Sequence, residues 1–441
     1  MAAPHSCLLR AGWYGQLECL RGVWLALAVA LCALALAPAS DATSASLVGI
    51  NYGRVGSNLP PPQAVLPLLE GLGIGRVRLY DPDPAVLHAF AKTGVELFVG
   101  VPDQSLAGLA ADPGSADSWL RTNVLQFLPD TKIAALTVGN EVLTGNNSAL
   151  IRALLPAVQS LHGALVKLGL DKQIAVTTAH NLGVLGTSYP PSAGAFRKDL
   201  LPYICPILDY HARTASPFLV NAYPYFAYSD DPKGIHLDYA LLEAGYAGVP
   251  DPNSGLHYPN LLVAQVDAIY HAIAAANTAA ARVVEVRISE TGWPSSGEPA
   301  ETAATPQNAA RYNSNAMRLV AEGKGTPLKP AVALRAYVFA LFNENMKTGL
   351  ASERNYGLFK PDGTPVYELS YKLPRDNSTF GGGAGGGSGW RFPGDGNATG
   401  GYGNDGINNG YYDISAASAD SEGKWRWAQA AVAGAIVVLV A

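Results

Sequence analysis

The chain of 441 residues has few cysteines and few charged residues. Three of its four cysteines, Cys7, Cys19 and Cys32, lie in the first 32 residues, so Cys205 has no partner in the rest of the chain and no disulfide framework can form there. Metal-binding spacings of His, Cys or acidic residues are missing too, and we expect no metal and no cofactor. With 30 Lys and Arg against 35 Asp and Glu, the basic excess that nucleic-acid binding needs is also absent.

Both ends of the chain carry apolar runs too short to cross a bilayer, which takes roughly 20 residues. The first run covers 15 residues, 23–37, after Arg10 and Arg21 and before the small residues Ala37-Pro38-Ala39. A basic start, a short apolar stretch and a small-residue cleavage site are typical of a secretory signal peptide, and we assign it to residues 1–40. The alternative is an uncleaved signal anchor.

The second apolar run, residues 430–441, reaches the last residue of the chain. A polar spacer at 421–424 and small residues at 415–420 precede it. This order is the signal for replacing the tail with a glycosylphosphatidylinositol (GPI) anchor, so we expect residues 421–441 to be removed and the protein to sit at the outer face of the plasma membrane or in the cell wall. The alternative is a frayed hydrophobic terminus.

Residues 376–420 have the composition of a tether, with 14 glycines between positions 381 and 410. Asn377 and Asn397 begin N-glycosylation sequons in this segment, and Asn146 begins a third inside the folded part. We predict a glycosylated linker, although a pattern this short also occurs without being used.

The remaining residues, 41–375, alternate short apolar runs rich in β-branched residues with helical periodicity, for example at 149–168 and 261–276. The predicted strands are Leu47–Tyr52, Arg76–Tyr80, Val95–Val101, Ile133–Asn140, Ile174–Thr178, Pro217–Tyr223, Val283–Ser289 and Ala331–Phe339. Eight such units predict an α/β fold, a single closed (β/α)₈ TIM barrel, with a long excursion at 225–261 after the sixth strand. An open doubly wound sheet is the alternative, but the glycines at 71–75 have the wrong spacing for its phosphate loop.

Two glutamates follow predicted strands directly, Glu141 after the fourth and Glu290 at the end of the seventh. These strands lie three apart around an eight-membered ring, so the two carboxyl groups can converge at the face where such barrels hold their chemistry. Two facing acids are what glycosidic cleavage requires, one to protonate the leaving oxygen and one to attack the sugar or activate water. Either glutamate alone could equally be a salt-bridged surface acid.

Several motifs make the chain similar to the plant family 17 glycoside hydrolases over roughly residues 47–372. They are Gly49-Ile50-Asn51-Tyr52-Gly53, Arg78-Leu79-Tyr80-Asp81, Val138-Gly139-Asn140-Glu141, Asn221-Ala222-Tyr223-Pro224-Tyr225-Phe226, Ser289-Glu290-Thr291-Gly292-Trp293-Pro294 and Phe342-Asn343-Glu344-Asn345-Met346-Lys347. The resemblance implies retaining endo-hydrolysis of β-1,3-glucan, with Glu141 as acid/base and Glu290 as nucleophile. It also implies that Glu344, Lys347 and Glu353 form a neighbouring charged cluster, and that the biological setting is the plant cell wall and plant defence.

The two roles make opposite demands on the two carboxyl groups. A nucleophile must be ionised, so Glu290 needs donors or a cation, for which Lys347 is the candidate. The acid must keep its proton, which burial or the charge of Glu290 can arrange by raising the pKa of Glu141. Asn140 could bond the sugar 2-hydroxyl, a contact that strengthens in the transition state.

Further residues at the strand ends are candidates for substrate binding, because aromatic rings cover the C–H faces of sugars and hydroxyl or amide groups bond their rims. They are Asn51, Tyr52, Tyr80, Tyr223, Trp293 and Phe342. Aromatic side chains are also ordinary core material.

Three functions therefore stay open at this point. The first is a β-1,3-glucanase, which we expect to act as a monomer with the glucan polymer and the membrane lipid as its partners. The second is a hydrolase of mixed β-1,3/1,4-glucan, because linkage choice depends on cleft shape. The third is a surface protein that binds glucan without cleaving it.

Overall fold

The computed structural model describes residues 47–277 and 279–374. The predicted signal peptide, linker and anchor signal, with Asn377 and Asn397, lie outside these residues. All eight predicted strands and all the predicted catalytic and substrate-binding residues lie within them.

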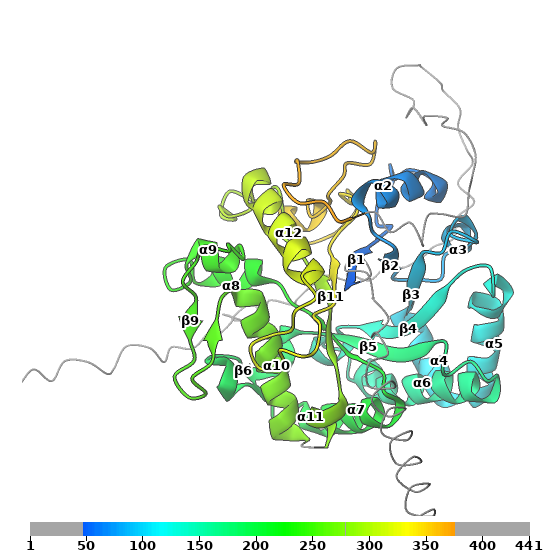
Figure 1. Cartoon of the computed structure of the whole chain (residues 1–441). Helices are drawn as coiled ribbons and strands as arrows, with labels where there is room; N and C mark the ends of the chain where they lie inside the picture. Colours follow the sequence, from blue (N-terminus) through cyan, green and yellow to red (C-terminus); the bar gives the residue numbers. More distant parts are fainter. Residues whose placement is uncertain (1–46, 278, 375–441) are drawn as a thin grey trace, which may run out of the picture. The chain divides into compact units, whose positions relative to one another are not determined.

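The described strands close into the predicted barrel of eight parallel strands, in the order β1-β12-β11-β8-β5-β4-β3-β2 (Figure 1). Its strands are β1 (Val48–Asn51), β2 (Arg76–Arg78), β3 (Glu96–Val101), β4 (Ile133–Asn140), β5 (Ala175–Asn181), β8 (Phe218–Asn221), β11 (Val286–Thr291) and β12 (Ala336–Val338). All eight predicted strands are confirmed, and the open-sheet alternative is excluded. The seventh and eighth begin later than predicted, because the chain before β11 is helical and only residues 336–338 pair in β12.

Helices connect consecutive strands and cover the outside of the barrel. They are α2 (Val65–Leu72), α3 (Pro84–Ala89), α4 (Asp103–Ala111), α5 (Pro113–Asn123), α6 (Ser148–Lys167), α7 (Leu201–Thr214), α8 (Pro224–Asp230), α9 (Leu237–Ala240), α10 (Leu261–Ala276), α11 (Ala280–Val283) and α12 (Pro306–Ala321). In the described chain β12 leads instead into a loop with a 3₁₀ helix, η7 (Ala351–Arg354). Helix α6 is long and apolar enough to span a membrane by composition, but it packs on α4 and β5 as a barrel helix.

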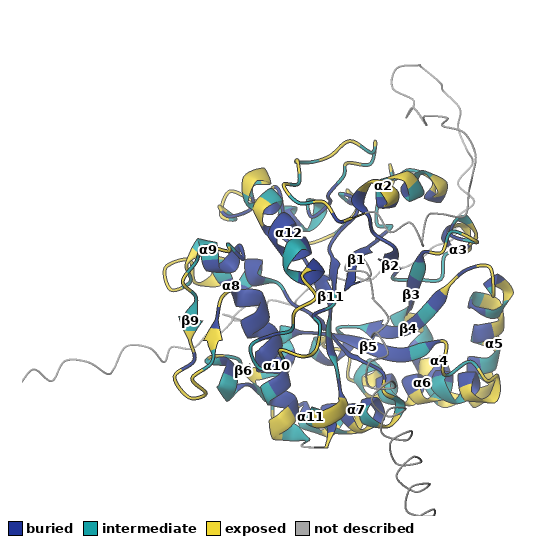
Figure 2. Ribbon diagram, viewed as in Figure 1, coloured by how far each residue is buried: buried dark blue, intermediate teal, exposed yellow. Residues whose placement is uncertain are grey.

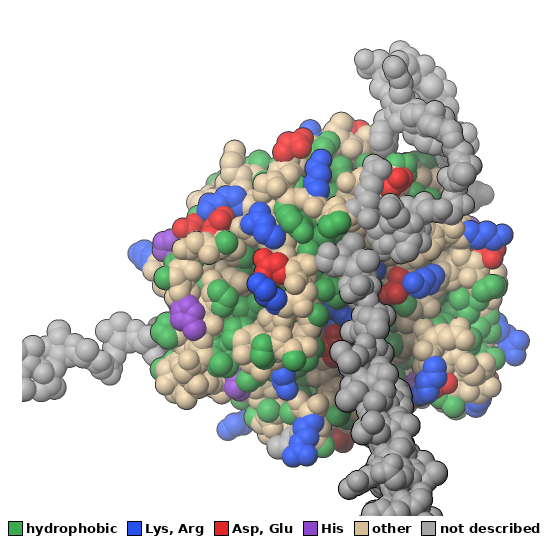
Figure 3. All heavy atoms as spheres, viewed as in Figure 1, with side chains coloured by type: hydrophobic (Ala, Val, Ile, Leu, Met, Phe, Trp, Pro, Cys, Tyr) green, Lys and Arg blue, Asp and Glu red, His purple; other side chains and the backbone are tan. Residues whose placement is uncertain are grey.

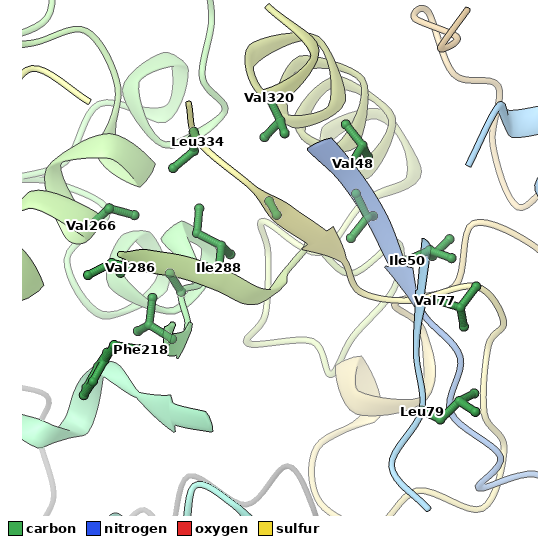
Figure 4. Close-up of a cluster of buried hydrophobic side chains, with 14 of the residues drawn as sticks. Val48, Ile50, Val77, Leu79, Phe218, Val266, Val286, Ile288, Val320 and Leu334 are labelled. Carbon is green, nitrogen blue, oxygen red and sulfur yellow. The ribbon is translucent and has the colours of Figure 1, made fainter. Parts of the chain in front are cut away.

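The main core lies between the strands and the surrounding helices. Figure 4 shows Val48, Ile50 and Ile288 of the strands in one cluster with Val320 of α12 and Val266 of α10. Parallel strands covered by helices bury both faces, which explains their nearly continuous apolar sequence and the dark strands of Figure 2. A second, smaller cluster is built from Phe98, Ala135, Ala179, Leu219 and Tyr337.

The excursion predicted after the sixth strand follows β8, but it is more ordered than a long loop. It holds α8, α9 and a two-stranded hairpin of β9 (Val249–Pro250) and β10 (His257–Tyr258). Asp251 ties this hairpin to the loop after β5, because its carboxylate accepts hydrogen bonds from the Ser192 amide and hydroxyl at 2.8 and 2.7 Å.

Candidate active site

The ends of β4 and β11 bend where the two predicted acids lie. At the end of β4 the backbone is left-handed at Gly139 (φ 66°) and again at Glu141 (φ 58°), a conformation that costs a non-glycine residue about 1 kcal/mol or more. The pairing of β11 with β8 shifts between Ile288 and Glu290, a bulge that redirects the side chains after it. Strain and bulges of this kind gather at functional sites, since the surrounding fold must hold them in place.

The carboxyl group of Glu290 accepts hydrogen bonds from three donors. Its Oε1 accepts from Arg78 Nη1 at 2.5 Å and from the Tyr80 hydroxyl at 2.8 Å, and its Oε2 accepts from the Tyr223 hydroxyl at 2.8 Å. Arg78 is 1 % exposed, so this ion pair is almost fully removed from water. Charge-assisted hydrogen bonds of this type favour the ionised carboxylate that a nucleophile needs.

The cation beside Glu290 is therefore Arg78, and the prediction of Lys347 for this place is wrong. Lys347 Nζ lies 3.4 Å from Glu344 Oε2 and 4.1 Å from the centre of the Phe339 ring. The sequence does hold a signal for Arg78, because an arginine in the middle of an apolar strand is buried and a buried charge needs a partner.

Glu141 has a different environment, with amide donors in place of a cation. Asn221 Nδ2 donates to its Oε1 at 2.7 Å, and Asn181 Nδ2 donates to its Oε2 at 2.8 Å. Burial, and after it the negative charge of Glu290, raise the pKa of Glu141 to about 7, against the lowering effect of the two amides and of Arg78. Glu141 can therefore give up or take up a proton near neutral pH. Sequence reasoning missed Asn181, and gave Asn221 no role.

A hydrogen-bond network joins the two acids. Arg78 Nη2 donates to Asn140 Oδ1 at 2.8 Å, and Asn221 Nδ2 approaches the same oxygen at 3.3 Å while it bonds Glu141. The main-chain amide of Asn140 lies 3.3 Å from the carboxylate of Asp103 at the start of α4. Positions 141 and 290 thus meet at one site, as the strand order requires.

Two members of the predicted charged cluster, Glu344 and Lys347, lie beside this site, and the place of Glu353 in that cluster stays a prediction. Glu344 is buried, and its Oε1 accepts from the main-chain amide of Val55 at 2.7 Å while its Oε2 pairs with Lys347. Glu353 lies in η7. Burial raises the pKa of Tyr356, and the negative charge of Glu353 raises it further. Glu344 and Lys347 share with Glu290 the walls of an open cavity.

Of the predicted substrate-binding residues, Tyr52 and Tyr80 line that cavity, and Tyr223 reaches Glu290. Asn140 Oδ1 lies within hydrogen-bond distance of Arg78 and Asn221, and its contact with the sugar stays a prediction. Trp293 and Phe342 are buried: the indole nitrogen of Trp293 donates to the Ala303 carbonyl at 2.8 Å, and the Phe342 ring packs edge-on against Tyr52 with ring centres 6.1 Å apart.

The prediction that Asn51 binds substrate is wrong, because Asn51 supports other residues of the site. Its side chain is fully buried, its Nδ2 lies 3.2 Å from the Ser289 carbonyl, and its Oδ1 lies 3.2 Å from the oxygen of the Tyr80 hydroxyl, whose shorter bond is to Glu290. These contacts orient the groups that hold Glu290, and they leave no surface for a sugar.

Among residues 47–277 and 279–374, no group of three or more His, Cys, Asp or Glu side chains is arranged to hold a metal ion. On the face seen in Figure 3, basic side chains are scattered, several of them next to acidic ones. Asn146 is exposed in the turn before α6, whose first amides Asn147 caps, and its glycosylation stays a prediction.

The chain is similar in sequence and in structure to known glucanases. It is 54 % identical over 335 residues to glucan endo-1,3-beta-glucosidase 10 of Arabidopsis thaliana, covering 76 % of this chain and 78 % of that protein. It is 51 % identical over 333 residues to glucan endo-1,3-beta-glucosidase 11 of the same plant, covering 75 % and 77 %. The solved structure of CJP38, a beta-1,3-glucanase and allergen of Cryptomeria japonica pollen, aligns with a TM-score of 0.69 at 38 % identity, over 74 % of this chain and all (100 %) of that one. The sequence model of glycosyl hydrolases family 17 matches residues 48–371, and the chain belongs to that family.

Proposed function

We propose that this protein hydrolyses internal β-1,3-glucosidic bonds of glucans with retention at the anomeric carbon. In the first step Glu290 attacks the anomeric carbon, and Glu141 gives its proton to the departing glycosidic oxygen. The C–O bond to the leaving sugar breaks as the C–O bond to Glu290 forms, which leaves a covalent glycosyl-enzyme.

The second step runs the same groups in reverse. Once Glu290 is esterified, its negative charge is gone, and the pKa of Glu141 falls because that charge was raising it. Glu141 then accepts a proton from water, the water oxygen attacks the anomeric carbon, and Glu290 leaves as a carboxylate.

The observation that carries this proposal is the difference between the two glutamates. Glu290 is bonded to a buried arginine and two tyrosine hydroxyls, whereas Glu141 is half-buried between two amides and has a pKa of about 7. Two carboxyl groups whose environments separate an anion from a proton carrier are the arrangement that acid/base and nucleophile roles require. A protein that only binds glucan has no need of that difference.

A substrate panel tests the proposal. The wild type is expected to release reducing sugar from laminarin, with less from lichenan and none from carboxymethylcellulose, and Glu290→Gln is expected to lose this activity. Glu70→Gln, at an exposed position of α2, is the matched control and should behave as the wild type. Lichenan as the better substrate would favour the mixed-linkage hydrolase, and equal release by wild type and Glu290→Gln would remove Glu290 from the mechanism.

We also propose that the enzyme is secreted, lipid-anchored and monomeric. The apolar ends of the sequence support secretion and anchoring, and a single chain supplies every residue of the site, which supports action as a monomer. Release of the protein from membranes by phosphatidylinositol-specific phospholipase C is expected, and attachment that survives the enzyme would contradict the anchor.

A further inference from the structure

Asn181, at the end of β5, is bonded in a way that leaves its amide only one orientation. Its Oδ1 accepts from the main-chain amide of Gly183 at 2.9 Å. Its Nδ2 donates to Glu141 Oε2 at 2.8 Å and to the Thr144 hydroxyl oxygen at 2.9 Å. Thr144 Oγ1 gives its own proton to the Glu141 carbonyl at 2.9 Å, so it must accept from Asn181.

This proton count means that the buried Asn181 always presents a donor to Glu141. A flipped amide would set its oxygen against the Glu141 carboxylate and its NH₂ group against the Gly183 amide, which loses each bond. A donor bonds a carboxylate more strongly than it bonds the same group after protonation. Asn181 therefore favours the ionised form of Glu141.

Asn221 donates to Glu141 as well, but its role is not separable from the rest of the site. Its Nδ2 also approaches Asn140, and its Oδ1 accepts from the Ser289 hydroxyl at 2.6 Å, next to Glu290. Asn181 bonds Glu141, Thr144 in the turn after Glu141, and Gly183 in its own turn, and none of these bonds reaches Glu290, so its effect on the acid can be isolated.

We propose that Asn181 is a positioning residue that lets Glu141 act as the base of the second step. The inference rests on the proposed function. Burial and the Glu290 charge hold a proton on Glu141, which serves the first step, and Arg78 opposes them. The Asp103 carboxylate is the further charged group near this turn, bonded to the Asn140 amide. Asn181 supplies a donor that lets the same carboxyl group ionise when water must be deprotonated.

Removing this donor is expected to change the pH dependence and to slow one step selectively. Hydrogen bonds to charged groups contribute about 1.5–3 kcal/mol, so in Asn181→Ala the alkaline limb of kcat/KM on laminarin should move up by about one pH unit. On a 2,4-dinitrophenyl β-laminarioside the leaving group needs no proton, and the second step limits the rate. There the acidic limb of kcat should move up by about one pH unit, so that kcat at a pH on that limb falls up to about tenfold with a parallel fall in KM, and raising the pH should restore it.

Two variants separate this effect from simple damage to the fold. Thr144→Val removes the second acceptor of Asn181 but keeps its bond to Glu141, so it should lower thermal stability without moving the alkaline limb. Asn181→Asp keeps an acceptor for Gly183 and adds a charge, so it should move the limb further up than Asn181→Ala does.

These measurements test the role of Asn181 separately from the proposed hydrolysis of glucan. A wild type that does not hydrolyse laminarin overturns the proposed function, and with it this inference. An active wild type whose Asn181→Ala variant keeps the alkaline limb in place, or loses kcat equally at every pH, overturns the inference alone.

Discussion

The buried ion pair between Arg78 and Glu290 gives the sharpest prediction of stability and activity together. We consider Arg78→Met, which keeps an unbranched stem and replaces the guanidinium group with a shorter, uncharged end. At an effective dielectric constant of about 20, unit charges about 4 Å apart interact by about 4 kcal/mol, and removing one partner of a buried pair typically costs about 3–5 kcal/mol. Since the two side chains are 1 % and 8 % exposed, solvent screening reduces this cost little, and we expect a loss of that size in the free energy of unfolding.

Thermal unfolding and laminarin hydrolysis would measure the two consequences. A loss of about 3 kcal/mol or more should lower Tm by about 6 °C or more, and kcat should fall by a factor on the order of 10² or more, because the nucleophile loses its charge-assisted donor. In Glu290→Gln, the further change Arg78→Met should cost less than half as much stability, since no anion is then left unpaired. Arg78→Lys keeps the charge and is expected to lose less stability than Arg78→Met.

A coupling between the two sites below about 0.5 kcal/mol, or an Arg78→Met enzyme with the kcat of the wild type, would refute the reasoning. In that case the nucleophile would not depend on Arg78, even though the two side chains are in contact.

Three further predictions use other parts of the structure. On laminarin, kcat/KM should fall tenfold for each pH unit above about pH 7, because Glu141, with a pKa of about 7, must carry a proton in the first step. A fall in kcat/KM that begins near pH 5 would contradict this. Burial raises the pKa of Asp267 in α10 to about 6, so the fold binds its proton more tightly than the unfolded chain does, and Tm should fall as pH rises from about 4 to 6. Asp267→Asn should reduce the change of Tm with pH over this range. A variant whose Tm depends on pH as in the wild type would show that Asp267 is not the group responsible. Gly100→Ala would drive a Cβ into the Tyr80 carbonyl group and should destabilise the barrel by about 2 kcal/mol or more. Gly108→Ala, in open space on α4, should be neutral or stabilising in the same thermal assay.

Most of the barrel was predictable because its signals are local. A buried parallel strand needs a short run of β-branched and apolar residues, and the run at 133–140 forms β4 with the predicted bounds. Helix α10, predicted over 261–276, also begins and ends there, since Asn260 caps its start through the Val263 amide. The position of the long excursion after β8 was predicted correctly. Its helices and hairpin were not predicted, because they depend on contacts such as that of Asp251 with a distant loop.

The roles of single residues were harder to predict, because they depend on partners far away in the chain. Arg78 meets Glu290 across 212 positions, and Asn181 meets Glu141 across 40. Trp293 follows a catalytic strand, as a sugar-binding ring would, yet it turns inward to bond Ala303.

By itself, the sequence determined the barrel and the pair of acids at the ends of its fourth and seventh strands, because strand pattern and strand ends are properties of neighbouring residues. Only the tertiary structure decided which acid is held as an anion and which can keep a proton. The charge state of a carboxyl group depends on the burial, cations and hydrogen-bond donors around it, and barrel closure is what brings Arg78 to Glu290 and the two asparagine amides to Glu141.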